Sequence, residues 1–155
     1  MTEATWEQVK LPGFGTSEPT SLMTSPESRV LQGWALADDK LLALRHLADN
    51  WDDLGALAPT PELVDSAITF FRSLRALDDI LPPNRVLAGP MGEIVFEWQS
   101  SGVVLEVEIE RPGVAEFYRK EVGSPPEMWD QSYDDKNNQD VSWGNSSAAD
   151  LFQAA

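Results

Sequence analysis

The hydrophobic period of this chain changes once along its length, and that change limits which folds are possible. Before Pro82 and Pro83, apolar residues recur at spacings of three, four and seven, which is typical of amphipathic helices. After Gly92, apolar and polar residues alternate, which is typical of strands with one buried face. Helices followed by a run of strands predict an α+β fold.

Two helices are expected before the change of period. Ser25 can cap the first helix, and the apolar stripe that follows it continues as far as Trp51. The second helix is expected to begin at Thr60, with Pro61 in its first turn, and to end before Leu81. Because the link between the two helices is short, they are expected to pack as an antiparallel pair.

Three strands are expected after the change of period, at residues 93–99, 103–110 and 114–122, with a short fourth strand at 85–87. Glycine-containing turns separate the three longer strands. The sequence therefore predicts two antiparallel helices packed on one face of a three- to four-stranded antiparallel β-meander.

The composition divides the chain into three parts. Residues 1–24 and 123–155 are rich in polar residues, proline or glycine and follow no helical or strand period. We interpret them as extended or disordered N- and C-terminal arms on a folded α+β domain at residues 25–122.

The charge of the chain is strongly acidic, with 26 Asp and Glu against 11 Lys and Arg and a formal net charge of -15. Such a charge repels polyanions, and we find no basic patch in the sequence. Direct binding to nucleic acid or to an anionic membrane is therefore not expected. A basic protein surface is the kind of partner that this charge would attract.

Three further features bear on the class of protein. The chain has no cysteine, which excludes disulfides, Cys-ligated zinc and thiol chemistry. Its N-terminus lacks the basic start and apolar run of a signal peptide, and no segment approaches the roughly 20 apolar residues that span a bilayer. We expect a cytoplasmic protein without a cofactor.

A family resemblance adds to this picture. The segment Asn50-Trp51-Asp52-x-x-Gly55-Ala56, a following amphipathic helix, and Gly92-Glu93-Ile94-Val95-Phe96-Glu97-Trp98 resemble a family of small bacterial proteins. That family shares an N-W-D-G-x-G-A segment and a G-x-I-x-x-E-W hairpin, and Asp53 stands where it carries glycine. The resemblance covers roughly Leu44 to Val122 and implies an α+β fold. The family has no established activity, so the resemblance assigns no functional residue.

The segment Asn50, Trp51, Asp52 and Gly55 is interpreted as a structural motif. Trp51 ends the apolar stripe of the first helix and can fill the core, while Asp52 can accept hydrogen bonds from backbone amides of the turn. The alternative is that Asp52 and Asp53 hold a divalent metal or act as an acid/base pair.

The strand expected at residues 103–110 should carry a ladder of acidic side chains. Glu106, Glu108 and Glu110 alternate with apolar residues and so share one face, with Glu97 expected nearby on the neighbouring strand. Two interpretations remain open: a solvated outer face, or a docking surface for a basic partner.

Aromatic and apolar residues are spaced through the acidic C-terminal arm. Exposed aromatic area is costly unless it docks on something, so these residues are candidate anchors. They either fold back on the domain or bind a partner. The candidates are Trp129, Tyr133, Trp143, Leu151 and Phe152.

These features favour a non-catalytic acidic module that binds a protein partner, in the manner of an antitoxin, an inhibitor or a subunit of an assembly. One alternative is a mimic of nucleic acid, and another is a divalent-metal-dependent hydrolase that uses the Asp and Glu residues above. No catalytic residue or metal ligand is assigned, and the oligomeric state stays open.

Overall fold

The computed structural model describes residues 25–77 and 79–134. The described chain contains two α-helices, one short 3-10 helix and five strands. In chain order they are α1 (Pro26–Ala43), η2 (Leu44–His46), α2 (Pro61–Arg75), β1 (Arg85–Ala88), β2 (Ile94–Ser100), β3 (Val103–Arg111), β4 (Val114–Glu121) and β5 (Glu127–Ser132).

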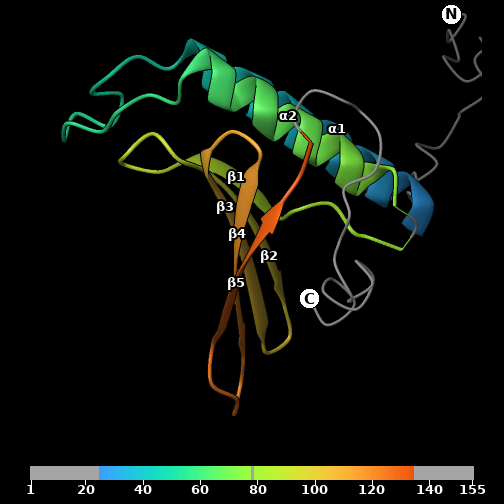
Figure 1. Cartoon of the computed structure of the whole chain (residues 1–155). Coiled ribbons are helices and arrows are strands. Elements are labelled where there is room, and N and C mark those ends of the chain that lie inside the picture. Colours follow the sequence, from blue (N-terminus) through green and yellow to red (C-terminus); the bar gives the residue numbers. More distant parts are fainter. Residues whose placement is uncertain (1–24, 78, 135–155) are drawn as a thin grey trace, which may run out of the picture.

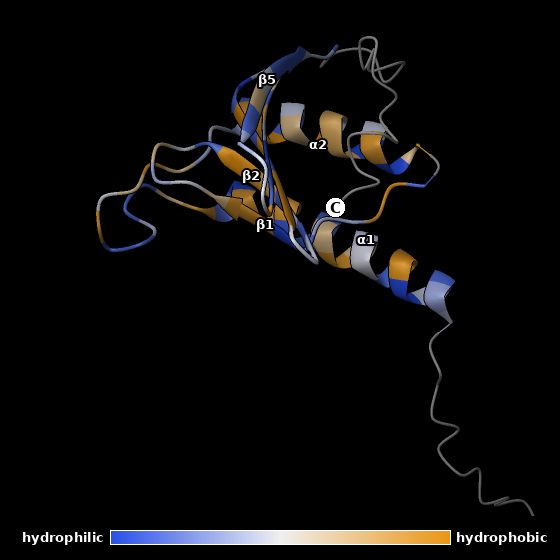
Figure 2. Cartoon of the chain, turned by 90° about the horizontal axis from the view of Figure 1, so that it is seen from below, coloured by the Kyte–Doolittle hydropathy of each residue, from blue (hydrophilic) through white to orange (hydrophobic). Residues whose placement is uncertain are grey.

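The elements form two layers. The five strands pair in the order β1-β2-β3-β4-β5, each antiparallel to its neighbour. Helices α1 and α2 lie side by side, run in opposite directions, and cover one face of the sheet (Figures 1 and 2). The expected α+β class and helix pair are therefore confirmed. Neither α-helix is long and apolar enough to cross a membrane.

Both helices begin at the capping residues that the sequence indicates. The Ser25 side chain accepts a hydrogen bond from Ser28 N at 3.2 Å, and Thr60 Oγ1 accepts one from Leu63 N at 3.2 Å. Each cap satisfies one of the amides that a helix N-terminus leaves without an intrahelical partner.

Aromatic rings join α2 to the sheet. The Phe70 ring centroid lies 5.8 Å from that of Phe96 and 6.3 Å from that of Phe117, and Phe71 stacks on Phe96 at 6.0 Å. All four side chains are fully buried. The core thus sits between α2 and strands β2 to β4, which leaves the opposite face of the sheet turned away from the helices.

The expected end of the first helix was wrong. The apolar spacing predicted a helix as far as Trp51, but α1 ends at Ala43, η2 follows, and Leu47 has extended backbone angles. The side chains of Asp49, Asn50 and Asp52 accept hydrogen bonds from backbone amides of the following loop. Such side-chain bonds compete with helix formation.

The expected number of strands was also too small. The structure adds β5 to the four expected strands, and β5 comes from the segment interpreted as a C-terminal arm. As an edge strand, β5 pairs with β4 alone, and it has no fully buried residue. The alternation of apolar and polar residues that reveals a half-buried strand is therefore weak here. Residues 1–24 and most of 123–155 lie outside the described residues.

Candidate functional site

Carboxylates gather on the face of the sheet that points away from the helices. Glu108 of β3 lies opposite Glu116 of β4, which in turn lies opposite Asp130 of β5. Glu97 and Glu106 form a second cross-strand pair between β2 and β3. We define the acidic face by six residues: Glu97, Glu106, Glu108, Glu110, Glu116 and Asp130.

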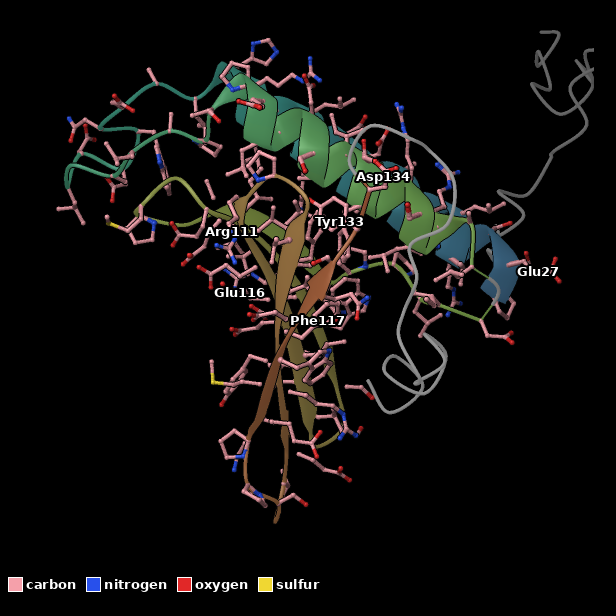
Figure 3. The ribbon with its side chains drawn as sticks, in the orientation of Figure 1. Glu27, Arg111, Glu116, Phe117, Tyr133 and Asp134 are labelled. Atoms are coloured by element: carbon pink, nitrogen blue, oxygen red, sulfur yellow. The ribbon has the colours of Figure 1, made fainter. Side chains whose placement is uncertain are left out.

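The acidic face contains all three glutamates that the sequence singled out on β3. Glu106, Glu108 and Glu110 project from the outer side, while their neighbours Val107 and Ile109 are fully buried. Adjacent residues of β4 diverge in the same way, so that Glu116 lies on the outer side and Phe117 on the core side (Figure 3).

Two members of the acidic face were not recognised as part of it from the sequence. Glu116 lies in the strand expected at residues 114–122 but was not expected on the acidic ladder, and Asp130 lies in the segment interpreted as an arm. The polar position at Glu116, next to a buried Phe117 in an alternating strand, was the available signal. Asp130 could be placed only once the pairing of β5 with β4 was known.

The electrostatics of the acidic face centre on Glu108. Partial burial, followed by repulsion from the carboxylates of Glu93, Glu110 and Glu116, raises the pKa of Glu108 to about 7. Glu108 therefore keeps its proton to a higher pH than a fully solvated glutamate does. Among the described residues, the ion pair on this face joins Arg85 Nη1 to Glu97 Oε2 at 3.5 Å, so most of the negative charge faces outward uncompensated.

The described carboxylates do not form a recognisable metal centre. No group of three or more His, Asp or Glu side chains within residues 25–77 and 79–134 has the arrangement that holds a metal ion. The rows of the acidic face instead spread their charge over neighbouring strands, which are about 4.8 Å apart in a sheet.

The loop between η2 and α2 holds the predicted structural motif. Asp52 Oδ1 accepts hydrogen bonds from Leu54 N at 2.9 Å and Ala56 N at 3.0 Å, and these bonds lower the pKa of Asp52. Asn50 Oδ1 accepts a bond from Gly55 N at 2.8 Å, and Gly55 has a φ of 93° that suits glycine. Side chains of the motif therefore shape the loop.

Trp51 does not enter the core, contrary to the role proposed from the sequence. Its side chain remains 38% exposed, and its Nε1 donates a hydrogen bond to the Leu57 carbonyl oxygen at 3.1 Å. Leu57 in turn bridges to Met91, which lies in the turn between β1 and β2. We define the apolar loop patch by its four exposed side chains: Trp51, Leu54, Leu57 and Met91.

Two of the five candidate anchors fold back on the domain. Trp129 stacks on Phe117 with ring centroids 5.1 Å apart, and Tyr133, which is buried, lies at the end of β5 beside α2 (Figure 3). Trp143, Leu151 and Phe152 lie outside the described residues. For Trp129 and Tyr133 the structure shows docking on the protein's own core.

Comparison with known proteins gives no relative: no family model, curated protein or solved structure matches the chain. The resemblance to a small bacterial family therefore stays a prediction.

Proposed function

We propose that this chain is a non-catalytic protein-binding module whose acidic face engages a basic surface on a partner. The observation that carries the proposal is the row of Glu108, Glu116 and Asp130, placed in register on three adjacent strands of a sheet face that no helix or strand of the described residues covers. An inhibitor or antitoxin that masks a basic site, or an acidic subunit of an assembly, would use such a surface.

Cross-strand pairs of like charge support this proposal because they destabilise the isolated sheet. Partial burial raises the pKa of Glu108 most, and repulsion from neighbouring carboxylates, Glu116 among them, raises it further. Lysine or arginine side chains from a partner would replace repulsion with attraction. The strongly negative surface would also speed the encounter with such a partner.

Nucleic-acid mimicry is a narrower form of the same proposal. The row from β3 to β5 presents carboxylates at the regular separation of neighbouring strands, about 4.8 Å, so it offers a line of negative charges to a nucleic-acid-binding surface. If mimicry is the role, DNA or RNA should displace the chain from its partner.

A charge-neutralised acidic face tests the proposal. We expect the full-length variant E108Q/E116Q/D130N to lose at least about 90% of the partner that the wild-type chain captures from cells of its source organism, since each close charge pair contributes about 1.5 kcal/mol or more. The control variant E27Q/D39N/D79N removes the same number of charges from exposed positions elsewhere. Quantitative mass spectrometry of affinity-purified samples gives the comparison.

The outcomes separate the alternatives. Capture of a partner by the wild type and the control, but not by the acidic-face variant, supports the proposal. Equal capture by all three chains contradicts it. Release of the captured partner by added DNA or RNA would identify the mimic.

A further inference from the structure

The apolar loop patch lies at one end of the sheet, where the η2–α2 loop meets the β1–β2 turn (Figure 1). Leu54 is 89% exposed, Met91 76%, Leu57 46% and Trp51 38%. Single exposed apolar residues are ordinary, but a group of four large ones on touching loops is typical of an interaction site.

Hydrogen bonds hold the two loops of the patch together. Leu57 N donates to the Pro90 carbonyl oxygen at 2.9 Å and so joins the two loops, while Met91 N donates to Glu93 Oε2 at 2.8 Å within the β1–β2 turn. A Cβ on Gly92 would lie 3.2 Å from the Ala58 carbonyl oxygen, so the backbones approach closely. A patch fixed in this way loses little conformational entropy when a partner binds.

A cavity of about 240 Å³ adjoins the patch. Leu57, Met91 and Leu63 give it apolar walls, and Glu62, Glu110 and Arg111 place charged groups along it. Its volume is sufficient for one large apolar side chain, and such a buried anchor is what dominates the energy of many interfaces.

The charge around the cavity indicates which residues should accompany that anchor. The cavity is lined by two carboxylates, Glu62 and Glu110, and by one cation, Arg111. Two more carboxylates, Asp52 and Asp53, lie in the loop that carries the exposed apolar side chains of the patch. The net charge of these residues around the cavity is negative. A ligand that complements it combines an apolar side chain with a neighbouring positive charge.

We propose that the apolar loop patch and its cavity form the docking site for an exposed segment of a partner protein that carries a large apolar residue next to lysine or arginine. This inference deepens the proposed function and rests on it, because Glu110 belongs both to the cavity and to the acidic face. The cavity would bind the apolar anchor, and the acidic face would bind the basic residues beyond it.

A selection from a random peptide library displayed on phage, with the full-length chain as target, tests this site. We expect the selected peptides to pair a large apolar residue with Lys or Arg within two positions. Titration of one synthetic peptide into ¹⁵N-labelled chain should shift the Trp51 indole N–H and the Met91 and Gly92 amides. The variant L54S/M91Q should weaken binding at least tenfold, since both side chains are exposed and can be replaced without disturbing the core.

Matched variants separate this inference from the proposed function. L31S/M128Q also removes exposed apolar side chains, at 61% and 77% exposure, and should bind the peptide as the wild type does. E108Q/E116Q/D130N should bind this short peptide within about threefold of the wild type, because a basic residue within two positions of the anchor meets Glu62 and Glu110 at the cavity and not the row beyond it. Selection without this consensus, or equal binding by L54S/M91Q, would overturn the docking site while leaving the acidic-face test intact.

Discussion

Replacing Tyr133 with alanine is expected to lower the free energy of unfolding by about 3–5 kcal/mol, the usual cost of removing a buried aromatic ring. The Tyr133 ring lies 5.3 Å from that of Phe70, and its hydroxyl is 2.6 Å from Ser66 Oγ. Ser66 Oγ also accepts a hydrogen bond from Gly113 N at 3.0 Å. Tyr133 therefore joins the end of β5 to α2 and to the β3–β4 turn.

Two control variants separate the contribution of the buried ring from those of the hydroxyl and of the strand. Tyr133→Phe keeps the ring and removes the hydroxyl, so it should cost about 1–3 kcal/mol from the polar partner left buried. Met128→Ala alters an exposed side chain of β5 and should change stability by less than about 0.5 kcal/mol. Urea denaturation compares the three. A cost for Tyr133→Ala no larger than that for Met128→Ala would show that β5 is not anchored as described.

Replacing Glu108 with glutamine is expected to stabilise the chain at pH 8 by about 1–2 kcal/mol, after allowance for solvent screening at this partly exposed site. The folded-state pKa of Glu108, about 7, lies above the value of 4.5 that is usual for a glutamate. Between these values the folded chain keeps a proton that the unfolded chain has lost. Wild-type stability therefore falls as the pH rises from 4.5 to 7, and the fall is complete above pH 7.

Denaturation curves from pH 4 to pH 8 test this expectation. The difference between Glu108→Gln and the wild type should be small at pH 4 and should grow through pH 7. Asp39→Asn, which removes an exposed charge on α1, controls for the change in net charge. A Glu108→Gln curve that runs parallel to the wild type would mean that Glu108 ionises without penalty in the folded chain.

The sequence predicted those parts of the fold that depend on neighbouring residues. Ser25 and Thr60 marked the helix starts, since capping is a local interaction, and alternation marked β2 and β3. The end of α1 was missed because its apolar spacing continues past the point where Asp49 and Asn50 begin to bind loop amides. A local hydrogen-bond network outweighed the helical pattern there.

The candidate site could also be predicted only where it depends on neighbouring residues. Alternation within β3 was enough to place Glu106, Glu108 and Glu110 on one face. The addition of Glu116 and Asp130 required the register of three strands, which one strand's pattern does not specify. The apolar loop patch depends on the contact of Leu57 with Met91, far apart in the sequence. Trp51 was expected in the core because its hydrophobicity and spacing match those of core residues, although it is exposed in the structure.

The central claim, that the acidic face binds a basic partner, is tested most directly by the salt dependence of the dissociation constant of the purified complex. Exposed charges are screened over about 10 Å at 0.1 M salt, so Kd should rise steeply between 50 and 500 mM NaCl for the wild-type chain. The E108Q/E116Q/D130N variant should bind more weakly at low salt and show a shallower slope. A Kd that does not change with salt, or slopes that are equal for the two chains, would contradict the claim.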